Sequence, residues 1–335
     1  DRQERRIFLA RDRFGVKPLY VVQRHGVLAF SSELRVLLET GLAERRLHRP
    51  ALLGYLRSGS VEEPDTIIEG VRMLPCGSWL EVDAQGQRAG TYWELPLEHG
   101  AFGVRDDYVA EIRHPLETSV RMRLVADVPV GVFLSGGIDS SAIVSVASRV
   151  SERPIHTFTV VLQDSALNEA SYAATVARRY GCHHQEVSLS SEVLRDSLQH
   201  ALAALDQPSS DGPNTYFVSE ATRQAGLRVA LSGIGGDEVF AGYRYFRLFR
   251  LARRLAAARV PYRALRAALP TAVIGKLPTS ARKLLWAVEP ERSTSNVYRS
   301  LRSMFDEQEV QRLVPSFYEP RLPSPEDLRV EEALA

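Results

Sequence analysis

The stretch V-G-V-F-L-S-G-G-I-D-S-S (Val130–Ser141) decides the fold of this 335-residue chain. Its first five residues form an apolar run without polar alternation, which is typical of a strand buried on both faces of a sheet. Ile143, Val146, Ala147 and Val150 then repeat at the spacing of one helix face. A glycine- and serine-rich turn between a buried strand and a helix indicates an anion site, because the first backbone amides of the helix point at the turn.

The alternation of strand and helix continues on the C-terminal side of this stretch. Apolar runs predict strands over 155–162, 184–189 and 228–232. Helical spacing over 173–180 predicts a helix that ends at Gly181. This order predicts an α/β fold with a doubly wound parallel sheet, in which ligands bind at the carboxyl ends of the strands.

The N-terminal part of the chain has a different pattern. Short alternating runs predict a β-rich domain over residues 1–95, followed by a linker at 96–106 that holds two glycines and a proline. The second domain is then 107–335. The first strands expected in the N-terminal domain are 7–10, 19–22 and 27–32.

Composition excludes several classes of protein. The chain is 44% apolar and 25% charged, with a formal net charge of +1, so nothing indicates a nucleic-acid or membrane partner. Cys76 and Cys182 lie far apart, which argues against a disulfide framework or a zinc site and favours a cytoplasmic location. The first residues lack Met and run at once into a strand, and we expect both ends of the chain to be cut.

The turn Ser135–Ser141 carries candidate chemistry. Gly136 and Gly137 permit a close backbone approach and unusual backbone angles. The lysine of a Walker-type loop is absent. Asp139 alone would repel a phosphate, and a bridging Mg²⁺ resolves that conflict because hard cations are held by carboxylate and phosphate oxygens together.

A second glycine-rich segment, L-S-G-I-G-G-D-E-V-F (Leu231–Phe240), also follows an apolar strand. Parallel strands would bring both segments to one edge of the sheet. Asp237 and Glu238 could then join Asp139 as ligands of one or two Mg²⁺ ions. G-G-D-E-V-F also resembles the signature of diguanylate cyclases, where it lies on a β-hairpin; its position after a strand that pairs with the first turn disfavours that reading.

Four segments together resemble glutamine-dependent asparagine synthetases and close amidotransferase relatives. R-D-R-F-G-V-K-P-L-Y (11–20) and F-S-S-E-L (30–34) resemble the later part of the glutaminase domain of that family. V-P-V-G-V-F-L-S-G-G-I-D-S-S (128–141) and L-S-G-I-G-G-D-E-V-F-A-G-Y (231–243) resemble the two hallmark segments of its synthetase domain. The resemblance implies a partial Ntn-type glutaminase domain of β-rich α+β class. A PP-loop, adenine nucleotide alpha hydrolase-like synthetase domain follows it, without its C-terminal part.

The resemblance also implies a reaction. In the family, ATP adenylates the side-chain carboxylate of aspartate with release of pyrophosphate, and ammonia from glutamine then displaces AMP. The residues implied to bind ATP or pyrophosphate are Leu134, Ser135, Gly136, Gly137, Asp139, Ser140, Ser141, Val160, Ser232 and Gly233. The residues implied to bind Mg²⁺ are Asp139, Asp237 and Glu238. The implied partners are small molecules: ATP, aspartate or a related carboxylate, and glutamine or ammonia. Whether the chain forms a homodimer is left open.

One departure from the family pattern concerns the acceptor. The family usually has an acidic residue between the glycines of its second segment, where it helps form and aminate the acyl-adenylate; Ile234 stands there. Asp211 is a candidate substitute. The alternatives are a rearranged site, a synthetase that acts on another carboxylate of β-lactam or sugar-acid type, and an inactive nucleotide-binding paralogue.

Other departures concern the glutaminase and the distal end. The family nucleophile is an N-terminal cysteine, whereas this chain begins with Asp1, so we do not expect the chain alone to hydrolyse glutamine. Cys76 is expected to pack in the core, and Arg11, Asp12 and Gly15 are expected to support the fold. The lysine-bearing distal segment of the family is not recognisable before Ala335.

Overall fold

A computed structural model describes residues 1–96, 108–162, 170–257, 279–287 and 293–317. The chain divides into two compact units. Unit 1 comprises Asp1–His99, Leu205–Ser210 and Arg247–Ala335, and unit 2 comprises Gly100–Ala204 and Asp211–Phe246. The expected linker at 96–106 lies almost wholly outside the described residues, so the division of the sequence at that point stays a prediction.

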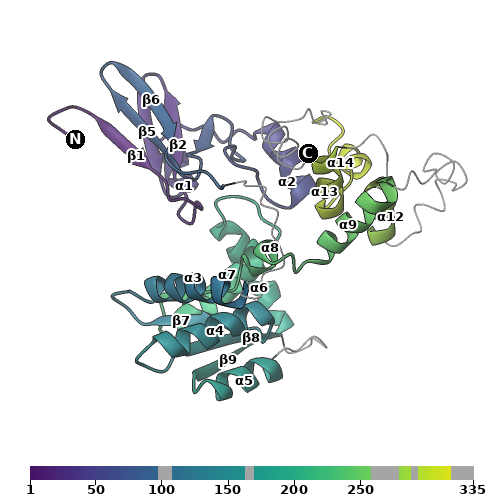
Figure 1. The fold of residues 1–335 in the computed structure, drawn as a ribbon. Helices are drawn as coiled ribbons and strands as arrows, with labels where there is room; N and C mark the ends of the chain where they lie inside the picture. The colour runs from purple at the N-terminus through teal and green to yellow at the C-terminus, as the bar shows by residue number, and fades with distance from the viewer. Residues whose placement is uncertain (97–107, 163–169, 258–278, 288–292, 318–335) are drawn as a thin grey trace, which may run out of the picture. The chain divides into compact units, whose positions relative to one another are not determined.

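Unit 1 contains two small antiparallel sheets (Figure 1). The first has the order β1-β5-β6 and the second β3-β2-β4. The strands are β1 (Ile7–Ala10), β2 (Tyr20–Arg24), β3 (Val27–Ser31), β4 (Val71–Met73), β5 (Ser78–Asp83) and β6 (Gly86–Thr91). The first three lie where alternation predicts them, whereas β4 has three residues, too few for alternation to show.

The helices of unit 1 come from both ends of the chain. They are α1 (Leu34–Glu39), α2 (Arg49–Ser58), most of α9 (Arg244–Ala257), α12 (Thr279–Ala287), α13 (Thr294–Arg302) and α14 (Glu307–Leu313). Helix α14 begins with a capping box between Asp306 and Glu309. It joins α2 through the ion pair of Arg57 with Glu307, at 2.8 Å. The C-terminal segment therefore packs with the N-terminal domain, which its sequence pattern does not indicate.

The buried Arg11 side chain connects segments of the N-terminal domain that lie far apart in the sequence. Its side chain is 3% exposed and makes two hydrogen bonds to the Glu63 carboxylate, at 2.7 and 2.8 Å. It also donates to the carbonyl oxygens of Gly15, Lys17 and Leu74. All five bonds lie within unit 1, so the expectation that Arg11 supports the fold has a physical basis.

We expect Arg11→Met to lower the free energy of unfolding by about 3 kcal/mol, chiefly because it leaves three carbonyl oxygens without their donor, while water can reach the part-exposed Glu63 carboxylate. Urea denaturation measures this change. Arg24→Met is the matched control, since the Arg24–Glu44 pair is exposed and such pairs contribute about 1 kcal/mol or less. Equal losses of unfolding free energy in the two variants would show that Arg11 contributes no more to stability than an exposed ion pair.

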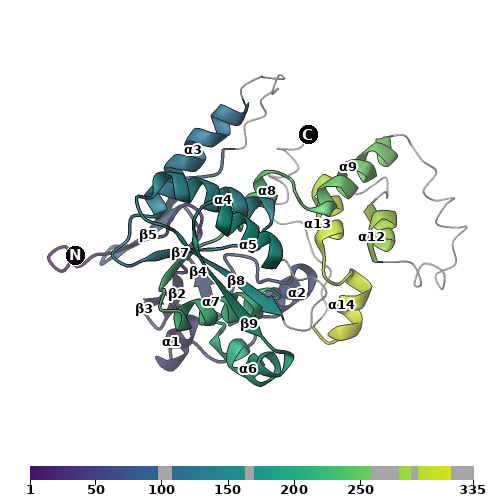
Figure 2. The same ribbon diagram turned by 90° about the horizontal axis from the view of Figure 1, so that it is seen from below.

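Unit 2 is built on a parallel sheet with the order β10-β7-β8-β9. The strands are β7 (Val130–Phe133), β8 (His156–Leu162), β9 (His183–Leu189) and β10 (Val229–Leu231). The helices are α3 (Tyr108–Arg123), α4 (Ile138–Val150), α5 (Ala170–Arg179), α6 (Ser191–Ala204), α7 (Gly212–Gln224) and the short α8 (Gly236–Val239). Figure 2 shows α4 and α5 on one face of the sheet and α6 and α7 on the other. The predicted doubly wound parallel sheet is confirmed.

The core of unit 2 lies between the sheet and the α4–α5 layer. Val132, Leu134, Val144 and Ala147 are all at most 1% exposed and belong to one apolar cluster. They come from the apolar run that ends at Leu134 and from the helix that follows it. The pattern that decides the fold therefore also forms its core.

The order of the strands indicates where a ligand would bind. After β7 the chain builds β8 and then β9 on one side, and later returns to add β10 on the other side of β7. Between β7 and β10 the order reverses, and the connections that follow these two strands diverge. In open α/β sheets ligands bind in the crevice outside such a switch point.

Candidate functional site

The turn after β7 is held by bonds among its own residues. The Ser135 hydroxyl accepts from the Gly137 amide at 3.2 Å and lies 3.0 Å from the Ser140 hydroxyl. Ser140, 7% exposed, accepts from the Ser135 amide and lies within bonding distance of the Gly137 carbonyl. Ser140 therefore shapes the turn from within, while Ser135 and Ser141 are more exposed. The first amides of α4 have no intrahelical acceptor, and such amides favour a bound anion, so the anion site at this turn stays a prediction.

Gly136 is required where the turn meets α5. Its φ is +84°, a conformation that L side chains rarely adopt. A Cβ atom there would lie 2.6 Å from the Tyr172 Cβ and 2.8 Å from the Ala173 amide nitrogen. The first turn of α5 therefore packs directly on the Ser135–Ser141 turn.

The segment after β10 lies against the first turn. A Cβ atom at Gly233 would lie 2.9 Å from the Ser140 amide nitrogen, and one at Gly236 would lie 2.4 Å from the Asp139 Cγ. The two glycine-rich segments are thus in direct contact, as the parallel arrangement predicts. Ser232 accepts a bond from the Ile234 amide at 3.2 Å, so its hydroxyl shapes the second segment.

The carboxylates expected to bind magnesium lie on both segments. The Asp139 carboxyl lies against the backbone of Gly236, and Gly236 immediately precedes Asp237. The Asp237 carboxyl lies close to Gly242, and Glu238 accepts a bond from the Tyr243 hydroxyl at 3.1 Å. In the described part of the chain no three His, Cys, Asp or Glu side chains are grouped to hold a metal. Mg²⁺ at nucleotide sites usually takes one or two carboxylates, with phosphate and water oxygens as its other ligands. Asp139 and Asp237 fit that donor set, and the assignment stays a prediction.

Two other predicted residues flank these segments. Leu134 is 1% exposed and ends the apolar run, and Val160 lies on the neighbouring strand β8, which extends to Leu162 beyond the level at which β7 ends. Both lie at the carboxyl edge of the sheet, where the resemblance implies an adenosine pocket, and that assignment stays a prediction.

The acceptor side carries the largest difference from the family pattern. Ile234 is 82% exposed at the carboxyl edge of the sheet, where it neither moves protons nor accepts hydrogen bonds through its side chain. Asp211 lies immediately before α7 and accepts a bond from the Asn214 side chain at 3.5 Å. Because α7 runs back antiparallel to the strands before β10, its first residues lie at the same edge as Ile234. The topology thus keeps Asp211 a candidate.

Cys76 corrects one expectation. It is exposed, whereas the sequence predicts a core position. It lies in the turn between β4 and β5, beside Gly77, whose φ is +64° and where an added Cβ atom would clash with the Trp93 carbonyl oxygen.

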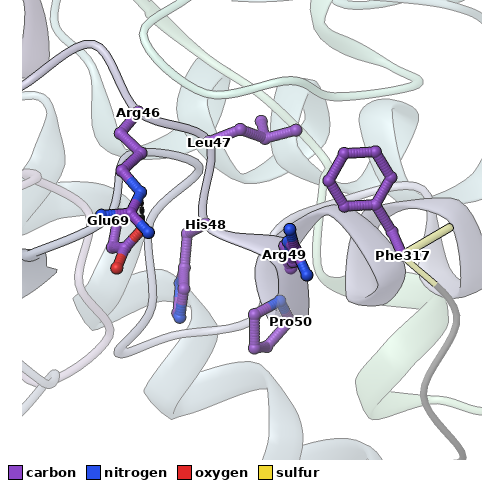
Figure 3. A pocket seen from close by; sticks show the side chains of 7 residues that line it. All are labelled: Arg46, Leu47, His48, Arg49, Pro50, Glu69 and Phe317. Carbon is purple, nitrogen blue, oxygen red and sulfur yellow. Dashed lines mark ion pairs between the residues drawn. The ribbon is translucent and has the colours of Figure 1, made fainter.

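Unit 1 also has a surface pocket of about 610 Å³, shown in Figure 3. Arg46 forms an ion pair with Glu69 at 2.8 Å, and the Arg49 guanidinium lies 4.9 Å from the centre of the Phe317 ring. His48 lies 3.2 Å from the Thr66 carbonyl through its Nδ1. The charged groups that line this pocket already contact one another or its wall, and we assign it no catalytic role.

Sequence reasoning missed two residues that support the site. Tyr172 supports Gly136 from α5, and the Thr159 hydroxyl donates to the Leu134 carbonyl from β8. A threonine inside a buried strand is the signal that could have identified Thr159, since a buried hydroxyl needs a partner.

Unit 2, a doubly wound parallel sheet with a glycine-rich turn at its switch point, has the fold of the PP-loop class. Residues 111–333 match the family described as asparagine synthase, and residues 1–93 match the glutamine amidotransferase domain. Since the first match covers more than half of the chain, the chain belongs to the asparagine synthase family.

Two of the curated relatives are named asparagine synthetases, and a third is named an amidase. Asparagine synthetase [glutamine-hydrolyzing] 3 of Bacillus subtilis is 30% identical over 264 residues, which are 73% of this chain and 42% of the relative. Asparagine synthetase [glutamine-hydrolyzing] 1 of the same organism is 32% identical over 244 residues, 72% of this chain and 38% of the relative. Amidase chyE of Penicillium rubens is 30% identical over 269 residues, 74% of this chain and 39% of the relative. The chain thus spans less than half of the length of these relatives.

Among solved structures, an NH3-dependent NAD synthetase from Campylobacter jejuni is 14% identical, with a TM-score of 0.33. The likeness covers 64% of this chain and 98% of that one. At this TM-score it adds nothing to the argument. Among the described residues, no helix combines the length and apolarity that crossing a membrane requires.

Proposed function

We propose that this chain is part of an ATP-dependent, amide-forming amidotransferase that activates aspartate as β-aspartyl-AMP. The observation that carries the proposal is the contact of Gly233 and Gly236 with Asp139 and Ser140. It joins two segments that would otherwise be separate turns into one anion site at the switch point of the sheet. Membership of the asparagine synthase family supports ATP as the nucleotide.

In the proposed reaction a carboxylate oxygen of aspartate attacks the α-phosphorus of ATP, and the bond to the β-phosphate oxygen breaks. Pyrophosphate leaves into the turn beside Gly136, where the first backbone amides of α4 stabilise its charge. Ammonia then attacks the activated carbonyl carbon, AMP leaves, and a proton is lost to give the amide. The amidotransferase match supports glutamine as the source of ammonia.

Magnesium is part of the proposal. Asp139 and Asp237 would hold it, and its charge would offset that of the phosphate groups. A cytoplasmic location is proposed because both cysteines are free thiols. Small molecules are the proposed partners, and a homodimer remains open to measurement.

The experiment is pyrophosphate release by the protein that contains this chain, with ATP, Mg²⁺ and aspartate. Release that needs aspartate supports the proposal. Release with other carboxylates but not aspartate would reassign the acceptor, to a β-lactam precursor or a sugar acid for instance. Binding of ATP in a calorimeter without any turnover would identify a nucleotide-binding paralogue.

The alternative acceptors are favoured by one observation, the exposed apolar side chain of Ile234 where the family has an acid. We expect Ile234→Glu to raise aspartate-dependent release by about tenfold or more, because general acid–base groups contribute about 10²–10⁴-fold. The exposed position also predicts a change in unfolding free energy of about 0.5 kcal/mol or less.

Val239→Glu is the matched control for this prediction. Val239 is 76% exposed on α8, so it receives the same charge in the same region without occupying the position between the glycines. An equal rise in both variants would assign the effect to local charge, and no rise with Ile234→Glu would contradict a simple loss of the acid.

A further inference from the structure

Strands β7 and β8 separate at the site in an unusual way. The Leu134 amide, just beyond β7, donates to the Phe158 carbonyl at 2.8 Å, which continues the regular parallel pattern. The next bond of that pattern would run from the Val160 amide to the Leu134 carbonyl. Among the described residues that bond is not formed. The Leu134 carbonyl instead accepts from the Thr159 hydroxyl.

We infer that Thr159 is a positioning residue for the nucleotide site, an inference that rests on the proposed function. Its hydroxyl takes the place of a backbone donor at the last carbonyl before the anion turn. The ladder therefore ends one residue before Ser135, and β8 continues to Leu162 without β7 beside it.

Burial makes this bond important. Thr159 is 5% exposed and Leu134 is 1% exposed, so water does not readily replace the hydroxyl as donor to the carbonyl. Without the hydroxyl, the regular parallel pattern leaves the Val160 amide as the backbone group that would donate to the Leu134 carbonyl. Pairing these two groups would extend the ladder, pull the start of the turn toward β8, and occupy the Val160 amide. The bond thus sets both the position of Ser135 and the availability of the Val160 backbone.

The chain offers a matched control on the same strand. Thr157 lies two residues earlier, is fully buried, and its hydroxyl lies 2.9 Å from the Nδ1 of His184 on β9. Thr157→Val removes a buried hydroxyl of the same kind without touching the anion turn. Any loss of packing or of general stability will appear in both variants.

The test is the ATP dissociation constant, measured calorimetrically with Mg²⁺ on the protein that contains this chain, together with the midpoint of thermal unfolding. We expect Thr159→Val to weaken ATP binding by about tenfold, since an unsatisfied buried carbonyl is costly enough to shift the turn. Thr159→Ser keeps the donor and should stay within about threefold of the wild type. Thr157→Val should lower the midpoint while leaving the dissociation constant unchanged.

Equal ATP affinity in Thr159→Val and the wild type would overturn the inference and leave the proposed function intact. Equal weakening in Thr159→Ser and Thr159→Val would overturn it as well, because the hydroxyl would then not matter. If Thr157→Val weakens binding as much as Thr159→Val, the effect is one of general stability and the inference fails. No ATP binding by the wild type would refute the proposed function itself, and the inference with it.

Discussion

Asp139→Asn is expected to reduce pyrophosphate release from ATP by about 100-fold or more, because a metal ion at a phosphoryl site supplies several kcal/mol of charge stabilisation. The Asp139 carboxyl lies against Gly236, and the amide of asparagine has the same shape as this carboxyl. The fold should therefore survive the change. What is lost is the negative charge that, on the proposed function, holds the cation beside the pyrophosphate.

Asp127→Asn is the control for the charge change. Asp127 is exposed in the turn before β7, at the opposite end of that strand from the site. Turnover by this variant should equal that of the wild type. The assay follows pyrophosphate at saturating ATP over a range of Mg²⁺ concentrations. Wild-type turnover by Asp139→Asn at low Mg²⁺ would remove Asp139 from the metal site.

The second large effect is expected at Gly136. An alanine there must adopt a φ of +84° and place its Cβ atom 2.6 Å from the Tyr172 Cβ, so either the turn or the first turn of α5 has to move. Because the proposed anion site consists of the first backbone amides of α4, which this turn positions, we expect Gly136→Ala to abolish detectable ATP binding in a calorimeter. Circular dichroism should show that the helices are retained.

Gly226→Ala separates backbone strain from the steric clash. Gly226 has the same φ of +84°, but no heavy atom lies within 4 Å of an added Cβ. That variant should lose about 1 kcal/mol of stability from the left-handed conformation and bind ATP normally. If Gly136→Ala also binds ATP normally, the contact with α5 does not fix the loop.

The sheet of unit 2 was predictable because two signals agree along its length. The apolar run that ends at Leu134 has no polar alternation, and helical spacing follows at once, so periodicity and connection length both indicate a parallel sheet. The return of α12, α13 and α14 to unit 1 was not predictable. Amphipathic periodicity shows that a helix has an apolar face, but it does not identify the surface that covers that face.

Within the site, the meeting of the two glycine-rich segments was predictable from parallel topology alone. The roles of individual hydroxyls were not. Ser140 resembles a phosphate ligand by motif, yet it is 7% exposed and bonded within the turn. Cys76 is expected to pack in the core, but it is exposed in the turn between β4 and β5. Such outcomes depend on local backbone angles, which a motif does not specify.

The reversed strand order of unit 2 has a consequence for how the protein is made. Val229 of β10 pairs with Val130 of β7, about 100 residues earlier in the chain, and contacts of such long separation form slowly. During synthesis, β7, β8 and β9 emerge well before β10, so the edge of β7 that later pairs with β10 is unpaired until β10 has been made. The proposed nucleotide site cannot form in that interval, since its second glycine-rich segment follows β10. A nucleotide that binds only the completed site would favour the pairing of β10 with β7, and so the last step of folding.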